Sequence, residues 1–447
     1  MSIPGYAEYK DSGVEWLGEV PSHWLVAPLK RGFDVRLGKM LQPEAMTDAD
    51  VPAPYLRAAN IQWGAVDLSD LKTMWFSTRE RELLALKAGD LLVSEGGDVG
   101  RAALWRSEVE ECYFQNSVNR VRPRGDDSTA YLYYWMATIK AKGYVDVLCN
   151  KSTIAHFTAE KVEAVPTPFP PTEEQIAIAD FLDRETAKID ALIAEQEKLL
   201  ALLTEKRQAT ISHAVTRGLD PNVPMKDSGI PWLGEVPAHW EHLQLGRLCT
   251  KVSDGPHFSP SYVEEGGVMF LSARNVRVDG WSLSDAKFVS EADYREFCKR
   301  VIPEVGDILY TKGGTTGIAR VVDLDFRFQV WVHVAVLKIN KDAVLPHYVA
   351  YALNSIGCYE QSQLYTRGAT NQDLGLTRMI RILLALPPIE EQAEIVSFLD
   401  GATAKIDLLR AQGLRTVELL RERRSALITA AVTGQIDVRG AVEREAA

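Results

Sequence analysis

The chain has 447 residues, 46% of them apolar and 25% charged, a composition typical of a soluble globular protein with two or more domains. Its formal net charge of −11 argues against a uniformly basic nucleic-acid-binding surface, so cations that bind nucleic acid must be gathered locally. Five scattered cysteines without a C-x-x-C pair predict neither a disulfide framework nor a zinc site. No segment has the length of a membrane span or the pattern of a secretory leader, so we expect a cytoplasmic protein that binds no membrane.

The first distinctive stretch is DSGVEWLGEVPSHW at 11–24, which occurs again as DSGIPWLGEVPAHW at 227–240. Eleven of the fourteen positions are identical, and we call each copy an opener. A longer match pairs PPTEEQIAIADFLDRETAKID at 170–190 with PPIEEQAEIVSFLDGATAKID at 387–407. The chain is therefore an internal duplication.

The segments between the strong matches resemble each other only in patches. GDLLVSEGGDVGRAAL at 89–104 aligns with GDILYTKGGTTGIARV at 306–321, and YLRAANI at 55–61 aligns with FLSARNV at 270–276. One scaffold whose two copies differ in the middle indicates two different specificities. The expected parts are an opener with a first domain (1–168), a first long helix (169–218), an opener with a second domain (219–385), a second long helix (386–437) and a tail (438–447).

The long matched segments are predicted to be helices with heptad spacing, which is typical of helices that pack along a seam. The predicted seam residues in the first helix are Leu182, Ile189 and Leu203, with Leu192 and Leu199 at the alternate positions. In the second helix they are Leu399, Ile406, Leu420 and Leu427, with Leu409 between them. We expect the two helices to pair antiparallel as a coiled-coil-like spacer. The alternative is that each helix packs only on its own domain.

The divergent domains are predicted to be α/β. Runs such as VNRVRP, VWVHVAVLKI and GDILYT indicate strands, and TAYLYYWMATIKAKGY and LPHYVAYALNSIGCY indicate one apolar-faced helix late in each domain. The complete fold is therefore expected to be α+β, with two pseudo-symmetric repeats of one α/β domain followed by one long helix.

Each opener carries two tryptophans around a Gly-Glu-Val-Pro turn: Trp16 and Trp24 in the first copy, Trp232 and Trp240 in the second. Large aromatic anchors usually fasten one element onto another. The second opener follows the first long helix, so it predicts a joint between helix and domain. We expect the first opener to pack on the end of the second helix, near AVTGQID at 431–437, which would close the repeats into a pseudo-symmetric ring.

Motifs of common enzymes are absent from the sequence. It contains no phosphate-binding loop, no dinucleotide-binding glycine pattern, no amino-methyltransferase tetrapeptide, no nucleophile elbow and no zinc-protease helix. His239 and His242 lack a third metal ligand nearby, and no nuclease constellation is convincing. We predict that the chain has no catalytic residue and no metal site.

Several polar clusters have the composition of nucleic-acid contacts. Arg120, Arg122 and Arg124 alternate in VNRVRPRG and would project from one strand face, either toward phosphates or toward nearby acids. Amides such as Asn116 and Asn119 are typical adenine readers. The glycine-rich hairpin tips differ between copies, with Glu95, Asp98 and Arg101 set against Lys312, Thr315 and Thr316. Either cluster could instead be purely structural.

Three further segments complete the candidate set: the late loops NKSTIAHF (150–157) and TRGATNQDL (366–374), and the turn SDGPHFSPSY (253–262). The predicted DNA-binding residues are Arg57, Asn60, Ser94, Arg101, Asn116, Asn119, Arg120, Arg122, Lys151, Ser152, Thr153, His156, His257, Ser259, Arg274, Asn275, Lys312, Thr315, Thr316, Arg367, Thr370, Asn371 and Gln372.

The opener, the PPxEEQxxIxxFLD…AKID junction and the GDxLxxxGGxxG hairpin resemble the specificity subunit of type I restriction–modification systems over nearly the whole chain. DGPHFSP with FLSARNV is similar to the start of a target-recognition domain of that family, whereas the first domain lacks a clear DGxH counterpart around 35–45. The resemblance implies a non-catalytic chain whose two target-recognition domains each read half of a bipartite site in double-stranded DNA. The paired helices would set the spacer.

The resemblance also implies partners: two methyltransferase subunits that use S-adenosylmethionine, and restriction subunits, acting as translocase and endonuclease, that use ATP and Mg²⁺. This chain itself would bind none of those cofactors. Two alternatives remain open at this point: a helical repeat scaffold that binds only proteins, and a catalytic fusion, against which the missing motifs weigh.

Overall fold

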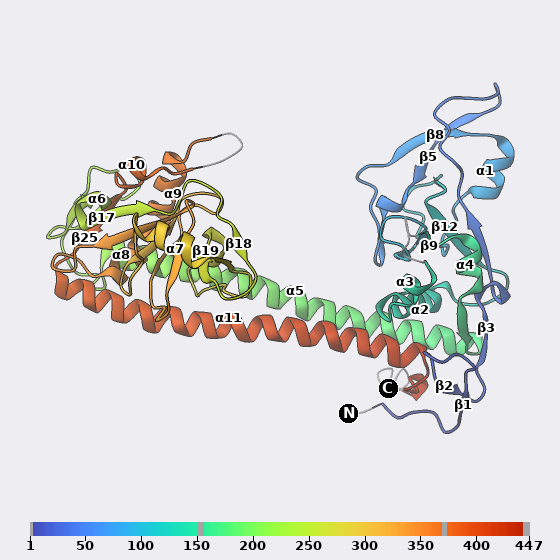
Figure 1. Cartoon of the computed structure of the whole chain (residues 1–447). Coiled ribbons are helices and arrows are strands. Elements are labelled where there is room, and N and C mark those ends of the chain that lie inside the picture. Colours follow the sequence, from blue (N-terminus) through green and yellow to red (C-terminus); the bar gives the residue numbers. More distant parts are fainter. Residues whose placement is uncertain (1–2, 150–155, 369–372, 441–447) are drawn as a thin grey trace. The chain divides into compact units, whose positions relative to one another are not determined.

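The computed structural model describes residues 3–149, 156–368 and 373–440, which form two compact units. Unit 1 comprises residues 1–195 and 416–447, and unit 2 comprises residues 196–415. Each unit contains one opener, one mixed domain and parts of both long helices (Figure 1). The duplication in the sequence therefore corresponds to two separately packed bodies, and each body uses residues from both repeats.

The domain of unit 1 is built on an antiparallel sheet with strand order β10-β9-β12-β4. Its strands are β4 (Phe33–Leu37), β9 (Leu91–Ser94), β10 (Ala102–Leu104) and β12 (Val118–Pro123). A second sheet, β11-β5-β8, contains β5 (Val51–Leu56), β8 (Lys72–Phe76) and β11 (Tyr113–Phe114). The leucine- and valine-rich β9 is buried along its whole length, as its central place in the sheet requires.

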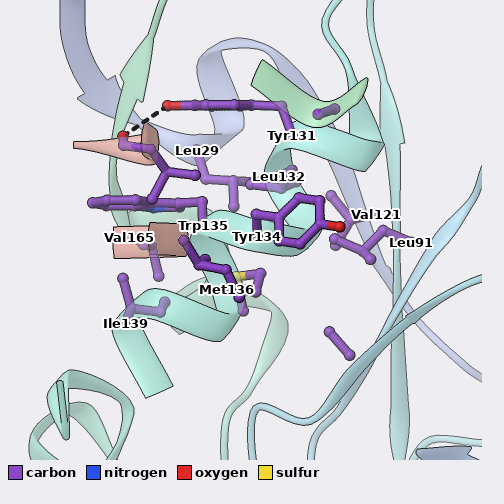
Figure 2. Close-up of a cluster of buried hydrophobic side chains, with 14 of the residues drawn as sticks. Leu29, Leu91, Val121, Tyr131, Leu132, Tyr134, Trp135, Met136, Ile139 and Val165 are labelled. Atoms are coloured by element: carbon purple, nitrogen blue, oxygen red, sulfur yellow. Dashed lines mark hydrogen bonds between the residues drawn. The ribbon is translucent and has the colours of Figure 1, made fainter. Parts of the chain in front are cut away.

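Helix α2 (Thr129–Ala141) supplies the centre of the core in unit 1. Figure 2 shows its Leu132, Trp135 and Met136 among side chains of the sheet and of the neighbouring segments. Ser128 caps the helix, since its side chain accepts a hydrogen bond from the Tyr131 amide. The predicted apolar-faced helix in this domain is therefore confirmed. The smaller elements of unit 1 are η1 (Leu29–Arg31), η2 (Ala58–Asn60), β6 (Ile61–Gln62), β7 (Ala65–Val66), α1 (Thr78–Leu84), α3 (Tyr144–Leu148) and α4 (Ala159–Ala164).

The domain of unit 2 repeats this plan with the strand orders β17-β24-β21-β22 and β18-β20-β19-β23. The first sheet contains β17 (Cys249–Asp254), β21 (Ile308–Thr311), β22 (Ala319–Val321) and β24 (Val334–Ile339). The second contains β18 (Tyr262–Val263), β19 (Val268–Leu271), β20 (Lys287–Val289) and β23 (Phe328–Val330). The short helices are α6 (Leu245–Leu248), η3 (Ala273–Asn275), α7 (Glu291–Cys298) and α10 (Leu376–Met379).

One helix prediction in unit 2 was wrong. The segment LPHYVAYALNSIGCY forms two helices, α8 (Pro346–Leu353) and α9 (Ile356–Tyr365). The break follows from local chemistry, because Asn354 ends α8 and Ser355 caps α9 by accepting a hydrogen bond from the Cys358 amide. A capping serine inside an apolar pattern divides one expected helix into two.

The long helices are α5 (Thr172–Arg217) and α11 (Ile389–Val432), and each ends at a glycine, Gly218 or Gly434, with positive φ. They pack against each other antiparallel within each unit. In unit 1, Leu182 shares a core with Ile428, and Arg424 Nε donates to Asp190 Oδ1 at 2.8 Å. In unit 2, the Arg207 guanidinium lies 3.1 Å from Asp407 Oδ1, and Leu200 packs over Gly413. Residue numbers fall along α11 as they rise along α5, so the predicted antiparallel pairing is confirmed.

The prediction of the seam was wrong at its alternate positions. Leu182, Ile189, Leu203, Leu399 and Ile406 are buried as predicted, and Leu420 and Leu427 are half-buried. Leu192, Leu199 and Leu409 are instead 53%, 44% and 51% exposed. The alternate positions that the partner helix covers lie four residues after each core position, whereas the predicted ones lie three residues after it. The covered residues are Thr186, Ile193, Leu200 and Arg207 in α5, and Thr403, Arg410 and Val417 in α11. Because leucines occupy both kinds of position, composition alone could not choose between them.

The first opener packs on the end of α11, as predicted. It includes β2 (Glu19–Pro21) and the end of β1 (Tyr9–Asp11), and the second includes β15 (Glu235–Pro237) and the end of β14 (Met225–Asp227). In unit 1, a Cβ at Gly434 would lie 2.3 Å from Pro21 Cδ and 3.2 Å from the Trp24 ring, and Tyr9 Oη donates to the Gly434 carbonyl at 3.0 Å. Next to each opener, β3 (Leu25–Pro28) pairs with β13 (Pro166–Phe169), and β16 (Glu241–Gln244) pairs with β25 (Leu383–Leu386).

Two leucines on α5 provide a matched test of the corrected seam. Leu203→Ala removes a buried side chain and should lower the free energy of unfolding by about 2–4 kcal/mol. Leu199→Ala removes an exposed one and should change it by less than about 0.5 kcal/mol. Urea unfolding of the isolated chain measures both, and equal losses would contradict the corrected seam.

Candidate nucleic-acid interface

The alternating arginines of β12 lie on one face of the strand, but they are engaged by acids of the fold. The side chain of Arg120 is 3% exposed, and its Nη atoms donate to the Leu83 carbonyl and to Asp34 Oδ2. Arg122 donates to both carboxylate oxygens of the buried Asp90, at 2.6 and 2.7 Å. Burial, with the charge of Arg122, lowers the pKa of the Arg120 guanidinium. The prediction that Arg120 and Arg122 form a phosphate track is corrected, because both hold the sheet together.

Three predicted amide readers are also structural. Asn60 and Asn275 are buried and close equivalent turns, in which each Oδ1 accepts a backbone amide three residues earlier, from Arg57 and from Ser272. Asn119 is buried, and its Nδ2 donates to the Phe157 carbonyl at 2.8 Å. Their assignment to DNA is corrected, since a buried amide that is bonded within the fold cannot reach a groove.

The hairpin that joins β9 to β10 is held from several sides. Arg101 donates to Gln62 Oε1 at 3.0 Å and to the Ala58 carbonyl, so it braces the tip. Ser94 is fully buried, and its prediction as a DNA contact is corrected. In unit 2 the equivalent tip leaves Thr315 exposed, whereas Thr316 is buried and its Oγ1 has no hydrogen-bond partner among the described residues.

Lys312 lies at the centre of a buried charge network that sequence reasoning missed. Its Nζ is 2.8 Å from Asp373 Oδ1 and 3.4 Å from Asp254 Oδ2. Asp254 is buried, and it also accepts from Arg300 and lies 3.3 Å from His257 Nε2. Opposite charges at these distances hold the turn after β17 against the hairpin. The DGPH motif marked the turn, but nothing in the sequence connected it with Arg300 or Asp373.

A glycine that follows β4 in unit 1 and β17 in unit 2 is the second feature that the sequence did not reveal. A Cβ at Gly255 would lie 1.9 Å from the Val330 carbonyl oxygen, and one at Gly38 would lie 2.3 Å from the Gln115 carbonyl oxygen. Both positions therefore require glycine, because two backbones approach closely there. Gly38 is the unit 1 counterpart of the glycine in DGPH, although the residues around it differ.

The predicted residues that stay available for a ligand are those on the exposed loops. The side chains of His156 and His257 are 54% and 60% exposed, although each lies beside an acid. Arg274, Ser259 and Arg367 are exposed, Asn116 is half-buried, and Arg57 is paired with Asp70 at 2.7 Å. The predicted residues Lys151, Ser152, Thr153, Thr370, Asn371 and Gln372 lie outside the described residues.

Burial shifts the pKa of one acid and of one histidine near the two hairpins. Burial raises the pKa of the Glu95 carboxyl in unit 1, and the charge of His156 opposes that rise. Burial, aided by the charge of Lys312, lowers the pKa of the His333 imidazole in unit 2. The hairpin residues Glu95 and Lys312 carry opposite charges, and both lie in surroundings of limited solvent access.

Within the described ranges, no group of three or more His, Cys, Asp or Glu side chains is arranged to hold a metal ion. Among the same residues, no helix combines the length and hydropathy that crossing a membrane requires.

Comparison with known proteins agrees with the duplicated architecture. The family model described as the type I restriction modification DNA specificity domain matches residues 33–201 and 237–419. The chain is 23% identical to the type I restriction enzyme EcoKI specificity subunit of Escherichia coli K12, with 94% of this chain and 90% of that protein covered. It is 24% identical to a putative MjaX specificity subunit of Methanocaldococcus jannaschii, with 95% and 96% covered.

Solved structures share the fold. A chain from a type I R-M system, studied for its complex assembly and conformational transition, has a TM-score of 0.65 and 16% identity, with 92% of this chain and 98% of that chain covered. The HsdS subunit from Thermoanaerobacter tengcongensis has a TM-score of 0.51 and 16% identity, with 93% and 98% covered. The predicted α+β fold of two repeats is confirmed.

A matched pair of arginines tests the structural reading of β12. Arg122→Ala leaves the buried Asp90 carboxylate without its cation and should lower the free energy of unfolding by about 2–3 kcal/mol. Arg124→Ala removes a side chain that is 52% exposed, and it should cost less than about 1 kcal/mol. Thermal or urea unfolding measures both. An Arg122→Ala variant as stable as the wild type would make Arg122 a candidate ligand contact again.

Proposed function

Because the chain belongs to the type I restriction–modification DNA specificity family, we propose that each of its units reads one half of a bipartite site in double-stranded DNA. A specificity subunit is the non-catalytic part of such an enzyme, in agreement with the missing catalytic motifs. The paired helices α5 and α11 set the spacer between the two half-sites, and the chain acts in the cytoplasm.

One observation carries this proposal: the two units share a scaffold down to individual backbone contacts and differ where side chains face the loops. The glycine-rich hairpins occupy the same place in both sheets, yet residue 95 is an acid and its equivalent, residue 312, is a cation. A repeated frame with different loop chemistry supports two half-sites of different sequence. Base readout depends on the side chains that the exposed loops present, whereas phosphate contacts position the frame.

The long helices support a second role, which is to assemble the complex. In unit 2, Leu199 and Leu202 on α5 and Leu408, Leu409 and Leu414 on α11 are 44–60% exposed. Large apolar side chains that a helix pair leaves exposed are available for contact with other proteins. We propose that two methyltransferase subunits and the restriction subunits bind this chain, and that S-adenosylmethionine, ATP and Mg²⁺ are used by those partners.

A protein-only scaffold remains the competing function. The exposed leucines on the helices favour it as much as they favour the complex, but it gives no reason for differing hairpins. Electrophoretic mobility of duplex DNA separates the two functions, because a protein-only scaffold should not retard duplex DNA at any salt concentration.

Exchanging residues 241–385 for the second domain of another family member tests the division into half-sites. The exchanged segment lies wholly within unit 2, so only one half of the recognised sequence should change. Mapping methylated positions genome-wide, in cells that also carry the partner subunits, identifies both halves. A change in both halves would refute independent reading.

An exposed arginine provides a salt-dependence test. Arg274 is exposed and makes no ion pair within the described part of the chain, so it is free to neutralise a phosphate. Arg274→Ala should reduce the slope of log affinity against log salt by about one. Arg124→Ala is the control because Arg124 bonds the Phe33 carbonyl, and its slope should stay unchanged. Equal slopes for wild type and Arg274→Ala would remove Arg274 from the interface.

A further inference from the structure

In both units, the hairpin is tied to the chain segment that follows the late loop by the same backbone hydrogen bond. The Phe157 amide donates to the Glu95 carbonyl at 2.9 Å, and the Leu374 amide donates to the Lys312 carbonyl at 2.8 Å. The residues just before these amides are His156 and Asp373. Residues 95 and 156 of unit 1 therefore occupy the places of residues 312 and 373 of unit 2.

The side chains at these places pair an acid with a basic group, and the two units place them in opposite order. In unit 1 the hairpin provides the acid, and Glu95 Oε1 lies 3.8 Å from His156 Nδ1. In unit 2 the hairpin provides the cation, and Lys312 Nζ lies 2.8 Å from Asp373 Oδ1. An arrangement that keeps its contact while exchanging its charges indicates that the contact, rather than either charge, is what the scaffold needs.

A third position changes consistently with this inversion. In unit 1 the strand register sets Leu37, at the end of β4, opposite Asn119. In unit 2 it sets Asp254, at the end of the equivalent strand β17, opposite Ala335. Leu37 and Asp254 therefore occupy equivalent places. Asp254 contributes a second acid to Lys312, at 3.4 Å. An acid at the place of Leu37 would stand near Glu95 and repel it. The apolar residue therefore belongs with the acidic hairpin, and the acid belongs with the cationic one.

Burial makes the polarity consequential. The side chains of Lys312 and Asp254 are 5% and 2% exposed, and that of Glu95 is 13% exposed. A charge that has been removed from water needs a partner of opposite sign, and two like charges at such a place are strongly unfavourable. A hairpin from one unit is thus incompatible with the corresponding segment of the other unit.

We infer that Glu95 and Lys312 are positioning residues for DNA recognition, which hold each glycine-rich hairpin in its reading position through ion pairs of opposite polarity. The three equivalent positions, 37, 95 and 156 or 254, 312 and 373, form one recognition clamp. Its hairpin residue and the residue after the late loop must be exchanged together, and an acid at position 37 or 254 is compatible only with a cationic hairpin. This inference rests on the proposed DNA-reading function. It extends that function by naming the residues that fix the hairpin, as distinct from those that touch bases.

The test converts the unit 1 clamp to the polarity of unit 2 in the full-length chain. Glu95→Lys alone sets two cations together, and His156→Asp alone sets two acids together. Each should weaken binding roughly tenfold to a duplex that carries the methylation-mapped site. The double variant restores an acid–cation pair and should bind within about twofold of wild type. Glu110→Lys, an exposed change of equal charge, is the control and should leave binding unchanged.

The readout that separates positioning from general stability is discrimination at each half-site. The single variants should lose discrimination between the mapped first half-site and a scrambled one, while discrimination at the second half-site stays at its wild-type value. In unit 2, Lys312→Glu should do the reverse. The triple variant with Asp373→His and Asp254→Leu should recover second-half-site discrimination. Single and double variants that are equally weak, or losses at both half-sites, would overturn the clamp.

The unfolding behaviour of the same variants keeps the clamp testable if DNA recognition fails. A thermal-unfolding cycle on residues 95 and 156 should show coupling, with the double variant more stable than the sum of the single changes predicts. If the wild type shows no sequence-selective binding, the proposed function is wrong, and this coupling alone judges the contact. Additive effects in the cycle would overturn the clamp regardless of DNA.

Discussion

A carboxylate at the first turn of each long helix, buried at Glu174 and half-buried at Glu391, is the interaction on which the rest of the structure depends. In unit 1, Glu174 accepts hydrogen bonds from Tyr6 Oη at 2.5 Å and Trp24 Nε1 at 3.0 Å, and it lies 2.9 Å from His23 Nε2. In unit 2, Glu391 accepts from Trp240 Nε1 at 3.0 Å and lies 2.8 Å from His239 Nε2. The helix N-terminus stabilises the negative charge, and the opener supplies the donors that a buried carboxylate requires.

This joint explains why the openers and the starts of the helices match so closely between the copies. The tryptophans Trp24 and Trp240 are fully buried, and a smaller or non-donating residue would remove one hydrogen bond from the carboxylate. Next to them, Gly434 and Gly218 end the opposite long helix and leave room for the opener, with a Cβ at Gly434 only 2.3 Å from Pro21 Cδ. Each unit therefore closes three segments around one acid, and the loops beyond it can vary without disturbing the frame.

The recognition loops follow a different rule from the joint. At the joint, residue identity is kept because one donor set satisfies one acid. At the hairpins, the backbone hydrogen bond is kept while the side-chain charges are exchanged, as Glu95 and Lys312 illustrate. Several cations that a basic surface would present to DNA are paired with acids inside the fold. Examples are Arg120 with Asp34 and Arg122 with Asp90. The acidic net charge of the chain is thus compatible with local pairing rather than with a broad basic face.

The duplication, the two long helices, the α+β class, the role of the openers and the family could all be predicted from the amino-acid sequence, because these depend on periodicity and on repeated local motifs. The leucines that enter the seam could not be predicted, because Leu199 and Leu200 are adjacent in sequence and differ only in the helix face they occupy. The fold also shows that Asn60, Asn119 and Arg120 are structural, since their burial and partners such as Phe157 and Asp34 come from distant segments. The inverted pairs at 95–156 and 312–373 join residues about 60 positions apart, and no local sequence pattern predicts a contact between segments that only the fold brings together.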